Sequence, residues 1–368
     1  MADTGGAACT TPVKVANLPA FPGADGAAAR IKDGRGGTVY HVTKLDTDFS
    51  NSAPGTLRYG LSLTGPRTIV FDISGVFSLG RTAVSGWNAN GNGWDTASRL
   101  TIPADVTLAG QTAPAPVILM GGVIKPGGTN IILRNVMYVY DAIDISGQNV
   151  MIDHVTAIYA TDETMSMNEM ANKVTIQHCI LALGQNYLQA DAEASDTKYT
   201  GHALGSLFQA GSNANVSVLH NLYAHLKGRL PRVGTEAAAL TAAGIGAYND
   251  FRNNVFYNWL GTAGMGSSGQ ASQNNFVGNF YLAGTRKIVA WADEPFNTSA
   301  TEGTEWRALV ATPAVSRPVG FDADGDGMRD SWESAHGLDP KVADNNGDFD
   351  FDCDGSTHLE EYLNQIAA

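Results

Sequence analysis

The sequence predicts an all-β solenoid, a parallel β-helix, followed by a small acidic module that binds calcium. Three observations support this prediction. Strand-like segments recur along the chain at a drifting but similar interval, as in proteins that revisit one strand position once per coil. Glycine makes up 42 of the 368 residues, above its usual share of about 7%. The formal net charge is −13, and nearly all of it lies in residues 321–368.

The recurring segment reads apolar–x–apolar–x–polar, the pattern of a strand with one buried face. Its four clearest copies begin at Ile131, Val150, Val174 and Val216, in steps of 19, 24 and 42 residues. Asparagines before apolar pairs continue the series at Asn221, Asn254 and Asn279, in steps of 33 and 25. The 42-residue step is close to two periods, and it and the 33-residue step are expected to carry looped-out insertions. An antiparallel sandwich is the alternative fold.

The chain divides into four predicted parts. We expect an N-terminal extension over residues 1–16, the β-helix over 17–310, a Pro-containing linker over 311–320 and the acidic module over 321–368. No apolar run is long enough to span a membrane, and no Lys/Arg cluster suggests a nucleic-acid partner. We expect neither partner, and a monomer.

The cysteines and the N-terminus bear on the cellular compartment. Cys9, Cys179 and Cys353 are odd in number and widely spaced, so no disulfide framework is predicted. Cys179 is expected to be a small buried core residue. Residues 1–11 show no signal peptide, which fits either a cytoplasmic protein or the mature form of a secreted one.

The acidic module contains two copies of an EF-hand calcium loop. Residues 321–368 hold 13 acidic and two basic residues, a net charge of −11. Both loops match D-x-[DN]-x-[DN]-G-x5-E, in which glycine permits the sharp turn and the last glutamate can bind bidentately. The predicted Ca²⁺ ligands are Asp322, Asp324, Asp326, Asp330 and Glu333 in the first loop, and Asp350, Asp352, Asp354 and Glu361 in the second. Short helices are expected over 331–336 and 359–363, and a solvated acidic tail is the alternative.

A second group of candidate residues lies on the predicted coils. Asp141 and Asp162 are 21 residues apart, so they would stack about 4.8 Å apart on successive coils and repel unless a cation bridges them. Glu163 is a possible third ligand. Arg229 and Arg232 flank a stiffening proline and suit bidentate binding of carboxylates. The alternatives are that Asp141 caps a turn and that both arginines are solvated.

At this point the sequence resembles the pectate lyase family. The segments that carry the resemblance are 21–26, 36–43, 54–58, 70–75, 108–114, 141–145, 152–154, 174–176, 220–223, 229–232 and 250–258. The resemblance covers roughly residues 17–290. It implies a right-handed parallel β-helix, secretion, and Ca²⁺-dependent β-elimination of α-1,4-linked polygalacturonate, an anionic polysaccharide.

The resemblance also implies roles for single residues. Asp141 and Asp162 match the family's calcium-binding aspartates, Arg229 its catalytic arginine and Arg232 a substrate-side arginine. The family's third calcium carboxylate corresponds to Ser166 here, so Glu163 or the substrate would complete the shell. Gly234 stands where the family has a further arginine, and residues 201–205 stand where it has a lysine.

The implied reaction removes the proton at C5 of a uronate and expels the glycosidic oxygen at C4. Arg229 as the base requires a neutral guanidine, which predicts an alkaline optimum because an arginine pKa is usually about 12.5 or more. Lys227, His202 and His225 are the other candidates for the base. We expect Lys227 and His202 to bind the substrate, and His225 to serve in binding or packing.

The sequence also fits two other functions. A glycoside hydrolase acting on pectin on the same fold would use paired carboxylates, for which Asp141, Asp162 and Glu163 are available. A non-catalytic polysaccharide-binding β-helix would bind the polymer without turnover. His154, His178 and His220 share one strand position; we expect a stacked polar ladder there rather than a metal column, because no carboxylate alternates with them.

Overall fold

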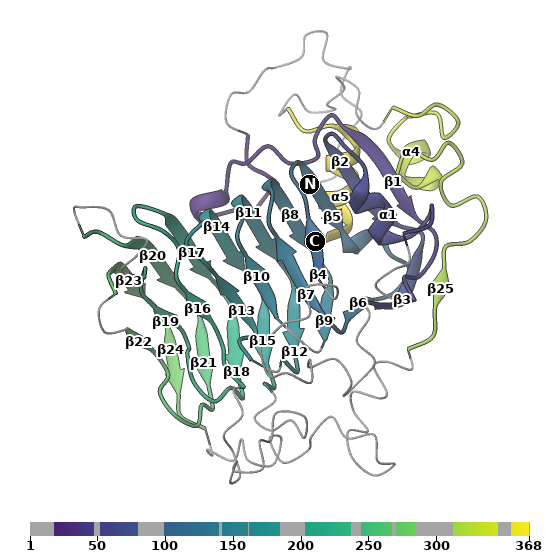
Figure 1. The fold of residues 1–368 in the computed structure, drawn as a ribbon. Helices are drawn as coiled ribbons and strands as arrows, with labels where there is room; N and C mark the ends of the chain where they lie inside the picture. The colour runs from purple at the N-terminus through teal and green to yellow at the C-terminus, as the bar shows by residue number, and fades with distance from the viewer. Residues whose placement is uncertain are drawn as a thin grey trace, which may run out of the picture.

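The computed structural model describes residues 18–47, 52–79, 99–139, 142–160, 162–184, 203–236, 244–266, 270–284, 312–344 and 355–367. In these residues the chain coils repeatedly through three sheets whose strands stack along one axis (Figure 1). All strand pairs between coils are parallel, and the one antiparallel pair joins β25 to β3. The described part of the chain is thus a parallel β-helix, as the repeat predicts.

Each sheet takes one strand from each coil. Sheet 1 contains β1 (Thr38–Val42), β2 (Arg67–Phe71), β5 (Val106–Ala109), β8 (Thr129–Arg134), β11 (Gln148–Asp153), β14 (Asn172–Gln177), β17 (Asn215–Leu219), β20 (Ala247–Arg252) and β23 (Ser272–Val277). Sheet 2 contains β4 (Arg99–Ile102), β7 (Val123–Pro126), β10 (Ile143–Ile145), β13 (Met165–Met167), β16 (Leu207–Phe208), β19 (Arg232–Val233) and β22 (Met265–Gly266).

Sheet 3 closes each coil. It contains β3 (Ile73–Ser78), β6 (Val117–Met120), β9 (Met137–Val139), β12 (Thr156–Ile158), β15 (Ile180–Ala182), β18 (Leu222–Ala224), β21 (Val255–Tyr257), β24 (Phe280–Leu282) and β25 (Val315–Ser316). The helices are α1 (Leu57–Ser62), α4 (Asp330–Ala335), α5 (His358–Ala367) and the 3₁₀ turns η1 (Gly26–Ala28) and η3 (Gly110–Thr112).

The register of sheet 1 confirms the predicted repeat. Val150 pairs with Ile131 on one side and with Val174 on the other, and Val174 pairs with Val216. All four are buried in one continuous apolar core. The 42-residue step is therefore a single coil with an insertion, and not two coils.

An asparagine ladder stabilises the corner between sheets 1 and 3. The side-chain oxygen of Asn254 accepts the backbone N–H of Asn221 at 2.9 Å, and Asn279 does the same for Asn254. The side-chain amides of Asn221, Asn254 and Asn279 donate to carbonyls of the strands beside them. The ladder therefore satisfies buried backbone groups where the chain leaves the sheet.

The N-terminal segment covers the outer face of sheet 1. Phe21 lies against Arg134, whose guanidinium carbon is 3.8 Å from the ring centre. The backbone N–H of Ala28 donates to the Thr175 hydroxyl at 2.9 Å. Strands of sheet 1 are consequently buried on both faces, which explains why Ile132 and Met151 lie in a second apolar cluster.

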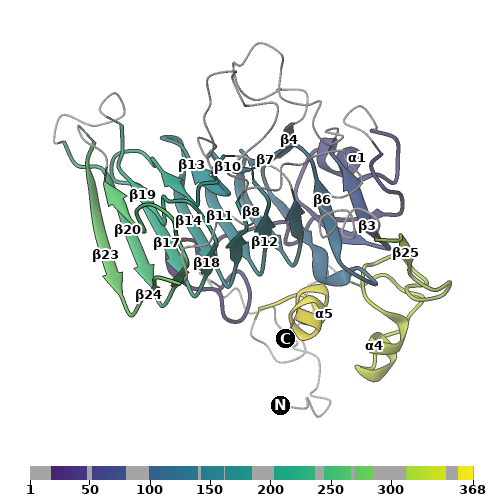
Figure 2. The ribbon, with the colours of Figure 1, turned by 90° about the horizontal axis from the view of Figure 1, so that it is seen from below.

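The acidic module packs against the first coils, as Figure 2 shows for α5. Leu359 and Tyr362 of α5 join Met328 and Ala109 in an apolar cluster. The segment expected to be a linker carries β25, which pairs with β3 between Pro313 and Pro318, so the prolines leave room for a two-residue ladder. Among the described residues, no helix is long and apolar enough to cross a membrane.

Candidate active site

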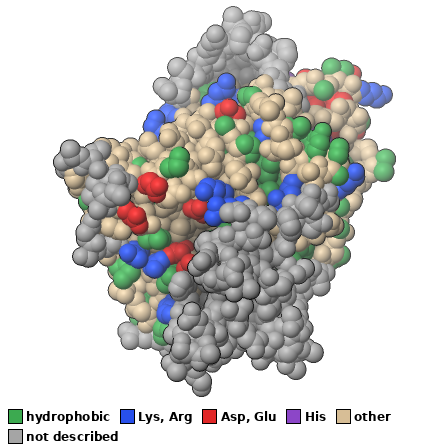
Figure 3. All heavy atoms as spheres, in the orientation of Figure 1, with side chains coloured by type: hydrophobic (Ala, Val, Ile, Leu, Met, Phe, Trp, Pro, Cys, Tyr) green, Lys and Arg blue, Asp and Glu red, His purple; other side chains and the backbone are tan. Residues whose placement is uncertain are grey.

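Two adjoining pockets lie over sheet 2. The larger, of about 420 Å³, is lined by Leu204, Lys227, Gly228, Arg229, Arg232, Gly261, Thr262, Met265 and Gly266. The smaller, of about 220 Å³, is lined by Arg99, Val123, Ala142, Asp144, Glu163, Ser166, Met167, Asn168, Leu207 and Gln209. On the face seen in Figure 3, basic side chains adjoin acidic ones near the middle of the molecule. Such mixed charge suits an anionic ligand held together with a cation.

The backbone places Glu163 and Arg229 two coils apart. Glu163 forms a parallel bridge with Leu204, and Leu204 forms one with Gly228. The Leu204 N–H donates to the Asp162 carbonyl at 2.9 Å, and the Ser206 N–H donates to the Arg229 carbonyl at 2.7 Å. Because successive strands are about 4.8 Å apart, only long side chains can meet across the intervening coil.

The long side chains do meet. The Arg229 guanidinium forms an ion pair with the Glu163 carboxylate, and their side chains are 24% and 12% exposed. Arg229 has a φ of 57°, in the left-handed region that costs a non-glycine residue about 1–2 kcal/mol. The pair links the two pockets, since Glu163 lines one and Arg229 the other.

The surroundings of Arg229 shift the pKa of its guanidinium in both directions. Burial lowers the pKa of the guanidinium, and the positive charge of Arg232 lowers it further, while Asp162 opposes the shift. Arg232 stands on β19, paired with Leu207 of β16. The structure therefore brings Asp162, Glu163, Arg229 and Arg232 into one charged group, and Lys227 lines the same pocket as the two arginines.

The other predicted residues divide into two groups. Asp141 and His202 lie outside the described residues. Ser166 lines the smaller pocket, where its hydroxyl accepts the Leu207 N–H at 3.0 Å. His225 bonds to the side-chain amide of Asn258 at 2.9 Å, and burial lowers the pKa of its imidazole.

Sequence reasoning missed one ion pair of this site. Lys125 and Asp144 pair at 3.6 Å on neighbouring strands β7 and β10. Asp144 stands three residues after the predicted Asp141. Alternation in Ile143–Ile145 places the Asp144 side chain outside the core, but the sequence gave no sign that Lys125 of the neighbouring coil pairs with it.

The first acidic loop forms two groups of carboxylates suited to a cation. Asp322, Asp324 and Asp326 make one group, and Asp326, Glu333 and Asp344 the other. Gly327 takes a φ of 95° at the predicted sharp turn. Asp330 accepts the Ala323 N–H at 2.7 Å at the start of α4.

Glu333 is the most telling member of this cluster. It is fully buried, and neither carboxylate oxygen has a hydrogen-bond partner among the described residues. Burial and the neighbouring Asp326 raise the pKa of Glu333 to about 8, and burial raises that of Asp326 to about 6. A buried carboxylate without partners is costly unless a cation neutralises it, so this donor set fits Ca²⁺.

The second loop is described only in part. Asp350, Asp352 and Asp354 lie outside the described residues, while Glu361 stands on α5. Both expected helices are present, as α4 and α5. Asp344 begins the sequence run Asp344-x-Asn346-x-Asp348, a further candidate ligand run that lacks the glycine and the distal glutamate of a complete loop motif.

Fold and site together define a class: a parallel β-helix with an arginine–carboxylate group over one sheet. No protein-family model matches the chain. Among curated proteins, it is similar to "Probable pectate lyase C" of Aspergillus terreus, with 32% identity over 79% of this chain and 59% of that protein. The protein of the same name from Aspergillus oryzae shares 31% over 86% of this chain and 64% of its own length. The chain thus spans about 60% of the length of these relatives.

The chain is also similar, at low sequence identity, to solved structures. A pectate lyase bound to a hexasaccharide shares 14% identity, with a TM-score of 0.44 over 79% of this chain and 94% of its own. A pectate lyase from Bacillus sp. N165 in complex with trigalacturonate shares 14%, with a TM-score of 0.43 over 71% of this chain and 88% of its own.

Proposed function

We propose that this chain is a polysaccharide lyase of the pectate lyase family that cleaves α-1,4-linked polygalacturonate by calcium-dependent β-elimination. The similarity to proteins named probable pectate lyase supports the class of activity. The observation that carries the proposal is the partly buried Arg229, whose pKa is lowered by burial and by Arg232 and whose guanidinium lies against the Glu163 carboxylate.

Each residue of the site has a role in this reaction. Arg229, when neutral, accepts the C5 proton, and the electron pair left behind expels the C4 oxygen. Arg232 binds a uronate carboxylate, with Lys227 and His202 as further substrate-binding residues. Asp162 and Glu163, with Asp141, supply hard oxygen ligands suited to calcium. Bound Ca²⁺ would neutralise the substrate carboxylate and stabilise negative charge in the transition state.

The acidic module has a separate role in this proposal. We infer that it binds Ca²⁺ through its two EF-hand-like loops, with Asp344 contributing to the first. The buried, unpartnered Glu333 supports this assignment. Because α5 packs on Ala109 of the β-helix, the ion would act as a structural clip. We propose that the protein is a monomer and that it is extracellular, in the compartment where calcium and the polysaccharide are both present.

Incubation with polygalacturonate, with and without EDTA, tests the function. Absorbance of a C4–C5 unsaturated product that disappears with EDTA and returns with Ca²⁺ supports the lyase. Reducing ends without an unsaturated product would indicate a hydrolase, and retention of the polymer without turnover a binding protein. A Glu333→Gln variant that is still calcium-dependent would assign the effect to the cleavage site and not to the module.

A further inference from the structure

A row of three histidines follows sheet 1 at its corner with sheet 3. In sheet 1, the residue after each of the strands β8, β11, β14, β17 and β20 has a φ between 52° and 57°. In order these residues are Asn135, His154, His178, His220 and Asn253. Asparagine is common in this left-handed conformation. The three middle coils use histidine in its place, and the rings stack with centroids 5.0 and 5.2 Å apart.

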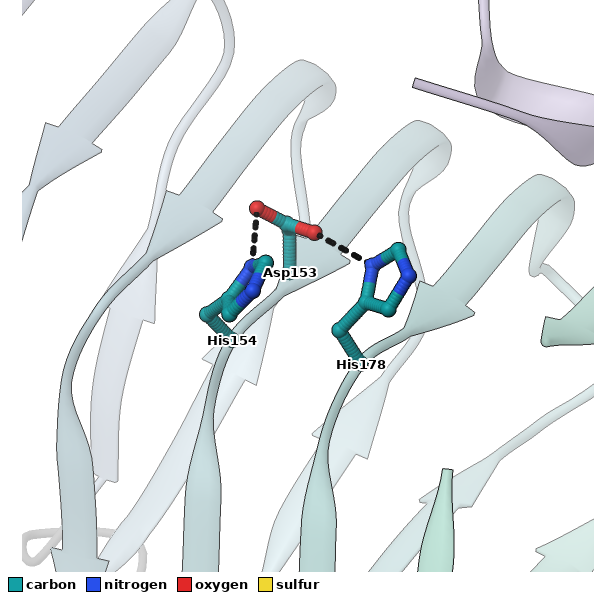
Figure 4. Close-up of side chains that lie close together, drawn as sticks. All are labelled: Asp153, His154 and His178. Carbon is teal, nitrogen blue, oxygen red and sulfur yellow. Dashed lines mark hydrogen bonds and ion pairs between the residues drawn. The ribbon is translucent and has the colours of Figure 1, made fainter. Parts of the chain in front are cut away.

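A buried carboxylate lies beneath two of these rings. Asp153 is fully buried, and its Oδ2 accepts from Nδ1 of His154 at 2.9 Å, while its Oδ1 lies 3.4 Å from Nδ1 of His178 (Figure 4). The imidazole side chains themselves are 46% and 38% exposed. Two rings from neighbouring coils thus converge on one carboxylate and leave their outer side open to solvent.

We propose that Asp153, His154 and His178 bind a divalent transition-metal ion of the zinc class. One ligand atom from each residue lies within 4.8 Å of the others. Ligands at about 2.0–2.1 Å around a tetrahedral zinc are roughly 3.3 Å apart. The two histidine–carboxylate distances, 2.9 and 3.4 Å, are close to that spacing, and the exposed rings would rotate to complete the geometry. Water would complete the shell.

The charges around Asp153 select the kind of ion. Arg134 donates from Nε to Oδ2 at 2.9 Å and Gln177 donates to Oδ1 at 2.8 Å, so the carboxylate is already balanced inside the protein. An ion must therefore gain most of its binding from the two imidazole nitrogens. Imidazole suits zinc, copper and nickel, whereas calcium prefers oxygen ligands. The site should bind Zn²⁺ in the presence of excess Ca²⁺.

The location of the site separates it from the cleavage chemistry. His154 and His178 follow β11 and β14 of sheet 1, whereas Arg229 and Glu163 lie over sheet 2. An ion there would link two neighbouring coils. Since it binds only the folded chain, it would raise the melting temperature without entering the reaction.

The test is Zn²⁺ titration of the full chain by calorimetry, with Ca²⁺ in excess, on four proteins. His154→Asn, His178→Asn and His220→Asn each introduce the residue that Asn135 and Asn253 show to fit this corner. We expect the affinity for one Zn²⁺ to fall at least ten-fold in His154→Asn and His178→Asn and to stay within two-fold in His220→Asn.

Three results would overturn the proposal: no Zn²⁺ bound by the wild type, equal binding in all four proteins, or an equal loss in His220→Asn. A melting curve supplies the second readout. Zn²⁺ should raise the melting temperature of the wild type and of His220→Asn, and leave His154→Asn and His178→Asn unchanged. All four proteins should have the same melting temperature in EDTA to within a few degrees, which checks that the variants fold.

Discussion

Glu163 and Arg229 form an ion pair across the coil that lies between them. In this pair Glu163, the proposed calcium ligand, contacts Arg229, the proposed base. A carboxylate bound to a guanidinium stabilises its protonated form, so Arg229 can act as a base only after Glu163 leaves it. A cation held by Asp162 would attract Glu163 away. The two residues therefore couple occupation of the metal site to activation of the base.

Replacement of Glu163 by Gln tests this coupling. We expect the Ca²⁺ concentration for half-maximal rate to rise about ten-fold or more, because even indirect partners of a metal contribute 10–100-fold to affinity. Asp144→Asn is the matched control, since Asp144 lines the same pocket but pairs with Lys125. If the calcium requirement were the same in Glu163→Gln and wild type, Glu163 would not be a ligand.

Replacement of Arg229 by Lys should lower turnover about 10²–10⁴-fold, which is the usual contribution of a general base. Substrate affinity should stay nearly unchanged. Burial and the charge of Arg232 lower the pKa of Arg229 from the usual arginine value of about 12.5 or more. The neutral fraction therefore grows about ten-fold per pH unit, and the wild-type rate should rise with pH on the alkaline side. Arg252→Lys, on sheet 1, is the control. A variant that keeps most of its activity would mean that another residue is the base.

Calcium should stabilise the acidic module through Glu333. Chelation is expected to lower the melting temperature, because it leaves a buried carboxylate without partners. In Glu333→Gln the rise of the melting temperature with Ca²⁺ should be smaller than in the wild type, and the melting temperature in EDTA should exceed that of the wild type in EDTA. Glu169→Gln, an exposed change outside the module, should respond as the wild type does. A calcium response of wild-type size in Glu333→Gln would show that Glu333 does not bind the ion of the first loop.

The repeat made the fold predictable, and local geometry limited what could be predicted of the sites. Ile131, Val150, Val174 and Val216 fall in register because alternation and period act together. Strand alternation would also send Asp153 and His154 to opposite faces. The φ of 52° at His154 turns the chain, so both side chains meet. The predicted stack is present, with no carboxylate between the rings, but the sequence pattern did not predict that Asp153 contacts two of them.

Contacts distant in sequence were the other limit. Arg229 and Glu163 are separated in sequence by a coil that carries an insertion. Because the length of that insertion breaks the regular spacing, the sequence does not show that the two residues lie near each other. Asp344 joins Asp326 and Glu333 from outside any loop motif. By contrast, Arg229 and Arg232 were singled out because a short motif holds them together, and the first calcium loop because the ligands of its motif, Asp322 to Glu333, lie within twelve residues.

The asparagine ladder should be a major source of stability at the corner of the coils. Asn254→Ala removes the side-chain acceptor of the Asn221 N–H and the donor to the Val218 carbonyl. Each buried group left unsatisfied costs about 1–3 kcal/mol, so the free energy of unfolding should fall by about 2–4 kcal/mol in urea titration. Gln273→Ala is the control, since Gln273 is exposed on the neighbouring coil and should change stability by less than about 0.5 kcal/mol. Equal losses in the two variants would show that the ladder adds nothing beyond an ordinary surface amide.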